Sequence, residues 1–242
     1  MLGGVATRRG DVPGGTSLTW VAGRIEATNL LQLTGPMEKV DFRRERTELY
    51  APSPTDFARV DVPAFDFLMI DGEGDPNTSE RYGQALEALY ALSYAAKFAS
   101  KKTLERDYVV APLEGLWHSD RMESFVDRSK NEWAWTMMIR QPDWLTDEIR
   151  DASRASAEKK SLPALPHVRA ERFEEGSSVQ ILHAGSYDDE GPTIARLHGE
   201  YLPAQGLVEN GLHHEIYLSD PRRIDAAKLK TILRQPVRPI HS

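Results

Sequence analysis

The segment "GLHHEIYLSD" (residues 211–220) has the alternation of a β-strand, and this alternation determines how the surrounding fold is interpreted. Successive side chains of a strand point to opposite faces of the sheet. The segment therefore presents two sets of side chains: His213, Glu215 and Tyr217 on one face, and His214, Ile216 and Leu218 on the other. Adjacent histidines on opposite faces cannot readily ligate one metal ion, so we expect no metal site here.

Ile216 and Leu218 make the second face apolar, which suggests that this face packs against helices. Glu215 would then lie on the open face of the sheet, toward any groove. The pattern alone leaves two interpretations of Glu215: a solvated strand glutamate, or the acid of a binding cleft.

The composition excludes several classes of protein. The chain has 242 residues, a net charge of −7 and a pI of about 5.6, and it shows no sustained basic stripe, so we expect no nucleic-acid partner. No run approaches the roughly 18 apolar residues of a membrane span, and the N-terminal segment lacks the apolar core of a secretory signal. The absence of cysteine excludes disulfides and thiolate catalysis. We therefore expect a cytoplasmic protein without membrane contact, cofactor or metal; its oligomeric state is open.

Residues 1–36 differ from the rest of the chain, because they are rich in Gly, Thr and Ala and show no strong period. We interpret them as a non-native extension, with a natural disordered arm as the alternative. The domain is then expected to span residues 37–242.

From residue 60 the predicted elements follow one order twice: strand, helix, strand, strand. The first set covers about residues 60–142 and includes a helix over 78–98; the second covers about 165–240 and includes a helix over 191–205. Segments 167–175 and 178–185 flank a Gly-Ser turn and predict a hairpin. The order predicts an α+β fold: a duplicated unit whose helices lie on one face of an antiparallel sheet, with a ligand cleft between the repeats.

Aromatic residues mark the segment "NEWAWTMMIRQP" (131–142). Strand alternation places Trp133, Trp135, Met137 and Ile139 on one face. Such a surface is either ordinary core packing or one wall of a pocket for flat aromatic ligands and cations.

The same two interpretations apply to three further segments. They contain Glu114 and Trp117 in "VVAPLEGLWH", Phe173 in "ERFEE", and His183 and Tyr187 in "SVQILHAGSY". The pattern favours a structural role for His183. Other sites are excluded, because "DGEGDPNTSERYG" lacks the Gly and Glu of a calcium loop and "HAGSYDDEG" lacks the G-x-S-x-G of a nucleophile elbow.

Four segments in order, "LEGLW", "NEWAWTMMIRQPD", "SVQILHAGSYDDE" and "HHEIYLSDPRR", resemble the GyrI-like small-molecule-binding proteins over about residues 40–240. The resemblance implies a tandem SHS2-type fold that binds hydrophobic, often cationic drugs between its repeats. It identifies Glu215 with the acid at the bottom of that cleft.

The similarity is greatest to the cyclopropanoid cyclopropyl hydrolases, which open the strained ring of DNA-alkylating natural products. It implies an aromatic cage of Trp117, Trp133, Trp135 and Tyr187, with Phe173 and Tyr90 less firmly placed. Glu114 and His183 complete the predicted ligand-binding set. Glu215 would direct a water molecule, and Tyr187 would hydrogen-bond the substrate carbonyl as it becomes a phenolate.

The predicted function is binding of aromatic xenobiotics and detoxification of cyclopropane-bearing alkylators by hydrolytic ring opening. The alternative is a non-catalytic protein that sequesters or senses drugs. A protein-inhibiting module, such as a gyrase-binding protein, is a third class.

Overall fold

A long antiparallel sheet organises the residues that the structure describes, which are 38–121 and 129–241 in this computed structural model. The interpretation of residues 1–36 falls outside this range and stays a prediction. The strands are β1 Lys39–Val40, β2 Ala58–Val62, β3 Phe65–Glu73, β4 Asp107–Tyr108, β5 Leu113–His118, β6 Ala134–Gln141, β7 Arg169–Phe173, β8 Gly176–Ala184, β9 Leu207–Glu209, β10 His213–Tyr217 and β11 Lys230–Pro239. The helices are α1 Phe42–Glu45, α2 Thr47–Tyr50, α3 Glu80–Thr103, α5 Asp147–Glu158, α6 Gly191–Arg196 and α7 Leu202–Ala204, with a π-helical turn, Leu197–Tyr201, between the last two.

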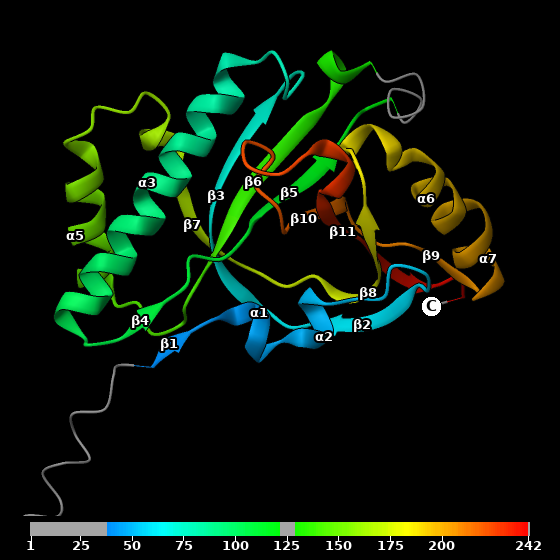
Figure 1. The fold of residues 1–242 in the computed structure, drawn as a ribbon, viewed down its shortest axis with the longest axis horizontal. Coiled ribbons are helices and arrows are strands. Elements are labelled where there is room, and N and C mark those ends of the chain that lie inside the picture. Colours follow the sequence, from blue (N-terminus) through cyan, green and yellow to red (C-terminus); the bar gives the residue numbers. More distant parts are fainter. Residues whose placement is uncertain (1–37, 122–128, 242) are drawn as a thin grey trace, which may run out of the picture. The chain divides into compact units, whose positions relative to one another are not determined.

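The strand order shows the predicted duplication. Eight strands lie in the order β2-β8-β11-β10-β5-β6-β3-β7, and β9 pairs with β11 (Figure 1). The set β3, α3, β5, β6 is followed in the chain by the set β8, α6, β10, β11, and the two sets meet where β5 pairs with β10. This arrangement confirms the predicted α+β class and the repeated unit.

The predicted hairpin between residues 167–175 and 178–185 is wrong. β7 pairs with β3, whereas β8 pairs with β2 and β11. The strand that begins each repeat has therefore crossed to the edge of the other repeat: β2 beside β8, and β7 beside β3. A short Gly-Ser connection permits a hairpin, but it does not dictate one, because pairing partners are set by packing far away in sequence.

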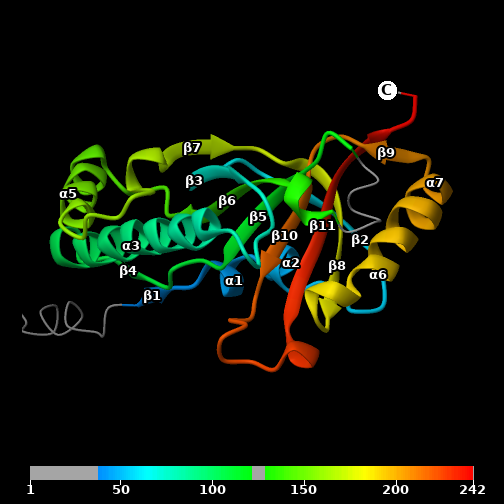
Figure 2. The same ribbon diagram turned by 90° about the horizontal axis from the view of Figure 1, so that it is seen from above.

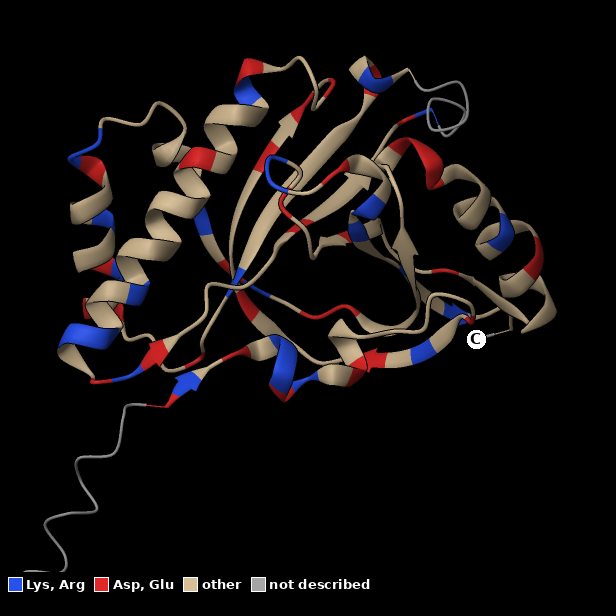
Figure 3. Ribbon diagram, in the orientation of Figure 1, with Lys and Arg blue, Asp and Glu red and all other residues tan. Residues whose placement is uncertain are grey.

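The long helix α3 begins where the sequence provides a cap. The Ser79 side chain accepts a hydrogen bond from the backbone N–H of Tyr82. Leu89 and Leu92 of α3 share a buried cluster with Ile139 of β6. The charges of α3 gather toward its ends, and much of its middle is uncharged (Figure 3).

The second repeat carries its helices on the same face of the sheet. Leu197, the first residue of the π-helical turn, and Leu202, the first residue of α7, pack with Val179 of β8 and Val237 of β11. Val179 faces the same side as Leu233 and Glu215, because the register pairs Leu233 with both Ile181 and Glu215. α3 and α6 thus flank the central strands, as Figures 1 and 2 show.

The predicted orientation of β10 is wrong in one respect. Alternation correctly separates His213, Glu215 and Tyr217 from His214 and Ile216. The helices were expected on the Ile216 face, however, and α3 and α6 lie on the face of Glu215. Glu215 pairs with Gly115, which pairs with Met137 beneath α3. Ile216 faces the other side, together with Glu114, where the short helices α1 and α2 lie.

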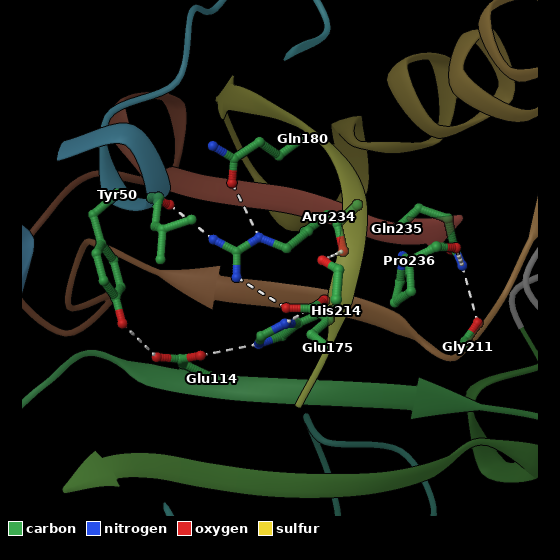
Figure 4. Close-up of polar contacts among 12 residues, drawn as sticks. Tyr50, Glu114, Glu175, Gln180, Gly211, His214, Arg234, Gln235 and Pro236 are labelled. Carbon is green, nitrogen blue, oxygen red and sulfur yellow. Dashed lines mark hydrogen bonds and ion pairs between the residues drawn. The ribbon is translucent and has the colours of Figure 1, made fainter. Parts of the chain in front are cut away.

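A buried polar network fills that other side (Figure 4). The His214 ring lies between two carboxylates, with Nδ1 3.0 Å from Glu175 and Nε2 3.1 Å from Glu114. Arg234 of β11 donates to Glu175 at 3.0 Å, and Tyr50 of α2 donates to Glu114 at 3.3 Å. These five groups join both repeats and the segment 42–50 across the β5–β10 junction.

His214 and Glu175 each shift the pKa of the other toward the charged form. Burial opposes the charge on His214, but the carboxylates of Glu175 and Glu114 outweigh it and raise the pKa of His214 to about 9. Burial likewise opposes ionisation of Glu175, and His214 with Arg234 overcomes it and lowers its pKa to about 2. Removal of one member would leave a buried charge without its partner. Such a network therefore favours one arrangement of the β-strands over others.

Gly72 of β3 lies opposite Trp135 of β6, and a Cβ there would lie 2.1 Å from the indole ring. Gly72→Ala should therefore lower the free energy of unfolding by about 1–3 kcal/mol, as overpacked core substitutions do. Urea denaturation measures the change. Gly83→Ala is the matched control, because a Cβ on Gly83 of α3 meets nothing within 4 Å. A neutral Gly72→Ala substitution would contradict the packing.

The raised pKa of His214 makes part of the stability depend on pH. The contribution of His214 to the free energy of unfolding is complete below pH about 6.5, the ordinary pKa of a histidine. It is lost as the pH rises through about 9, the pKa of His214 in the folded protein. The gap in unfolding free energy between the wild type and His214→Gln should therefore narrow over that interval in denaturation series. Nitrogen-15 NMR of the wild-type imidazole provides a second measurement; a His214 midpoint near 6.5 would refute the network.

Candidate functional site

A cleft of about 1880 Å³ opens on the face that carries α3 and α6, over the central strands β5 and β10. Its place at the junction of the two repeats agrees with the predicted cleft. The lining side chains include Tyr82, Leu86, Tyr90 and Tyr94 of α3, Trp117 of β5, Trp133, Tyr187, Glu190, and His213, Glu215 and Tyr217 of β10.

A chain of hydrogen bonds forms the floor of the cleft. Trp117 Nε1 donates to the Tyr217 hydroxyl at 3.0 Å, and that hydroxyl donates to Glu215 Oε2 at 2.7 Å. Gly115 makes room for this chain, because a Cβ at that position would lie 3.2 Å from Trp117 Nε1, from the Tyr217 hydroxyl and from Met137 Sδ. The Glu215 carboxyl is thereby fixed at the centre of the site.

The environment of Glu215 tunes its acidity. Burial is the largest effect and raises its pKa to about 7, while the hydrogen bond from Tyr217 and the charge of His214 act in the opposite direction. The carboxyl of Glu190, which is only 4% exposed, also hydrogen-bonds Glu215. Two carboxyl groups in contact favour sharing one proton, so the pair can both accept and release a proton near neutral pH.

His213 adds a neutral imidazole beside this pair. Its Nε2 lies 3.7 Å from Glu215 Oε1. Burial, followed by the charges of His198 and His214, lowers the pKa of His213 to about 3. A neutral imidazole that lines the cleft can contact a polar group of a ligand.

Aromatic rings surround the acidic floor. Trp117 and Trp133 meet edge to face with centroids 5.6 Å apart, and Tyr187 and Tyr217 do the same at 5.6 Å. Burial and the nearby carboxylates Glu190 and Glu215 raise the pKa of Tyr187 to about 12, so its hydroxyl remains a proton donor at neutral pH. Such walls favour flat apolar ligands, and the nearby carboxylates favour ligands that carry a cationic group.

The structure brings four of the predicted site residues together in the cleft: Glu215, Tyr187, Trp117 and Trp133. Tyr90, the less firmly placed cage residue, also lines it. Their roles toward a ligand stay predictions.

The other four predicted residues lie elsewhere. Glu114 belongs to the buried network on the opposite face, and Phe173 packs against Phe67 on that same side. Trp135 is 2% exposed and lies behind Tyr82, with ring centroids 5.1 Å apart. His183 is held by the carbonyl of Ser186 at 3.0 Å.

Sequence reasoning missed several lining residues. Tyr217 could have been found, since alternation already places it on the face of Glu215. Tyr82 and Tyr94 lie on one row of α3, separated by a multiple of four residues, and this spacing is the signal that could have identified them. Glu190 follows a 3₁₀ turn at Tyr187–Asp189, and no sequence period marks it.

Tyr217→Phe removes the hydrogen bond that holds Glu215 in its charged form, so the pKa of Glu215 should rise above about 7. Carbon-13 NMR of the glutamate carboxyls measures the midpoint. Affinity for a flat cationic dye should rise with pH as Glu215 ionises, and the variant should shift that rise to higher pH. Tyr201→Phe, outside the cleft, is the control; an unchanged midpoint in Tyr217→Phe would contradict the arrangement.

Comparisons with known proteins place these observations in context. The sequence matches the GyrI-like small molecule binding domain over residues 56–238. An uncharacterized conserved protein from Listeria innocua is 40% identical, with a TM-score of 0.75, and the match covers 83% of this chain and 100% of that one. A protein described as a hydrolase, from the same organism, is 39% identical, with a TM-score of 0.72 and the same coverage.

No functionally curated protein matches the chain. None of the helices formed by the described residues combines the length and the apolar character that crossing a membrane requires. The family match covers most of the chain, and the cleft, the duplicated sheet and the Listeria innocua structures agree with it: the chain belongs to the GyrI-like small molecule binding domain family.

Proposed function

We propose that the cleft binds flat, hydrophobic aromatic compounds and catalyses the hydrolytic opening of cyclopropane rings in DNA-alkylating compounds. The observation that carries the proposal is the Glu215 carboxyl, buried at the foot of aromatic walls with a pKa raised to about 7. A general base is most effective when its pKa lies near the working pH.

The reaction requires little covalent chemistry from the protein. Glu215 accepts a proton from water, whose oxygen attacks a cyclopropane carbon joined to a dienone. The carbon–carbon bond of the strained ring breaks, and its electron pair moves into the dienone to give a phenolate. The proton held by the carboxyl is then available to the phenolate, so the sum is the addition of one water molecule.

Tyr187 and the aromatic walls assist this step. A protonated Tyr187 donates a hydrogen bond to the oxygen that becomes the phenolate, which stabilises charge where it develops. Trp117 and Trp133 hold the flat ring system of the substrate and exclude bulk water. The Glu215 carboxyl then contacts only the water molecule that attacks the cyclopropane. The related Listeria innocua protein described as a hydrolase supports a hydrolytic reaction in this fold.

Incubation with a cyclopropane-bearing alkylator, followed by mass spectrometry, tests the proposal. The water adduct should form faster than in buffer. Glu215→Gln should reduce turnover about a hundredfold or more, as loss of a general base does. Tryptophan quenching by the same compound should persist, because Trp117 and Trp133 remain in place.

Glu200→Gln, an exposed substitution in the turn after α6, is the control and should turn over like the wild type. Quenching without an adduct would overturn the enzymatic part and leave a drug-sequestering or ligand-sensing protein. An adduct that forms equally fast in Glu215→Gln would remove Glu215 from the mechanism.

A further inference from the structure

A row of bulky side chains runs along α3 from the floor of the cleft to the protein surface. Its members are spaced by four residues and form the α3 ridge: Tyr82, Leu86, Tyr90, Tyr94 and Phe98. Residues four apart are neighbours on a helix surface. The first four line the cleft, and Phe98 continues the row beyond it.

The outer half of the α3 ridge is an exposed aromatic surface. Tyr90 and Tyr94 have ring centroids 6.5 Å apart and an interplanar angle of 30°; Tyr94 and Phe98 are 6.4 Å apart at 29°. Tyr94 is 47% exposed and Phe98 61%. No charged residue lies between Glu87 and Lys97, so this stretch of α3 is tan in Figure 3. Covering it would remove apolar area from water.

The cleft is larger than one compact ligand requires. Its volume of about 1880 Å³ exceeds the usual range of about 300–1,000 Å³ for small-molecule pockets. With a rise of about 1.5 Å per residue, the ridge from Tyr82 to Phe98 extends about 24 Å. A single fused-ring ligand at Glu215 would leave the outer part of this length unused.

We propose that Tyr90, Tyr94 and Phe98 form an outer subsite for a second aromatic unit of an elongated ligand, whose first ring system lies at Glu215. This deepens the proposed function, on which it rests. Carbon atoms in contact are about 3.5–4.0 Å apart, so a ring inserted between two others needs about 7 Å. The spacing of 6.4–6.5 Å is shorter, and the second unit therefore lies along the ridge rather than between its rings.

Two probes of different length test the subsite: a bis-benzimidazole dye and a single-benzimidazole dye with the same cationic end group. Fluorescence titration gives each dissociation constant. Tyr94→Ala and Phe98→Ala should weaken the two-unit dye about three- to tenfold, the size of an aromatic contact, and leave the one-unit dye within about twofold. Glu215→Gln should weaken both dyes by a similar factor, because both place their cation at the inner end.

Ile240→Ala, at an exposed apolar residue directly after β11, is the control and should affect neither dye. Equal losses for both dyes in Tyr94→Ala, or no loss for either, would overturn the subsite while the proposed function stands. Light scattering that shows Phe98→Ala converting a dimer to a monomer, with unchanged affinities, would assign the ridge to subunit contact instead. Failure of the wild type to bind either dye would contradict the proposed function and the subsite with it.

Discussion

The buried charge on His214 is the constraint on which the centre of this fold depends. It lies between Glu175 and Glu114, at the seam where β10 of the second repeat pairs with β5 of the first. A slip of one residue in β10 would turn His214 toward the cleft, leave Glu114 buried without its cation and leave Glu175 with Arg234 alone. The network thus selects the strand register, and the register in turn aims Glu215, the next residue, at the opposite face.

The two faces of β10 consequently have opposite electrostatic character. On the network side, the buried charges of His214, Glu175 and Arg234 meet partners of opposite sign. On the cleft side, Glu215 receives hydrogen bonds from Tyr217 and Glu190, and the adjacent imidazole, His213, is held neutral. The same strand therefore supplies both the rigid support of the site and an acid whose charge state can change near neutral pH.

Alternation in the sequence was sufficient to group His213, Glu215 and Tyr217, and the order of elements was sufficient to identify the duplicated α+β fold. A period of two separates the faces of a strand, but it does not reveal which face a distant helix will cover, so the side carrying α3 was assigned wrongly. Glu114 and Trp135 looked like site residues for a similar reason. Both have the right chemical type. Only the tertiary structure shows that Glu114 is an ion-pair partner of His214 and that Trp135 fills the space beside Gly72.

The exchange of β2 and β7 between the repeats limits how the cleft can adapt. Three ladders join the two repeats: β10 with β5, β2 with β8, and β7 with β3. The repeats are therefore tied together at the centre of the sheet and at both of its ends. We expect this arrangement to restrict hinge opening, so that ligands of different shape are accommodated by rotamer changes in the lining side chains rather than by movement of the walls.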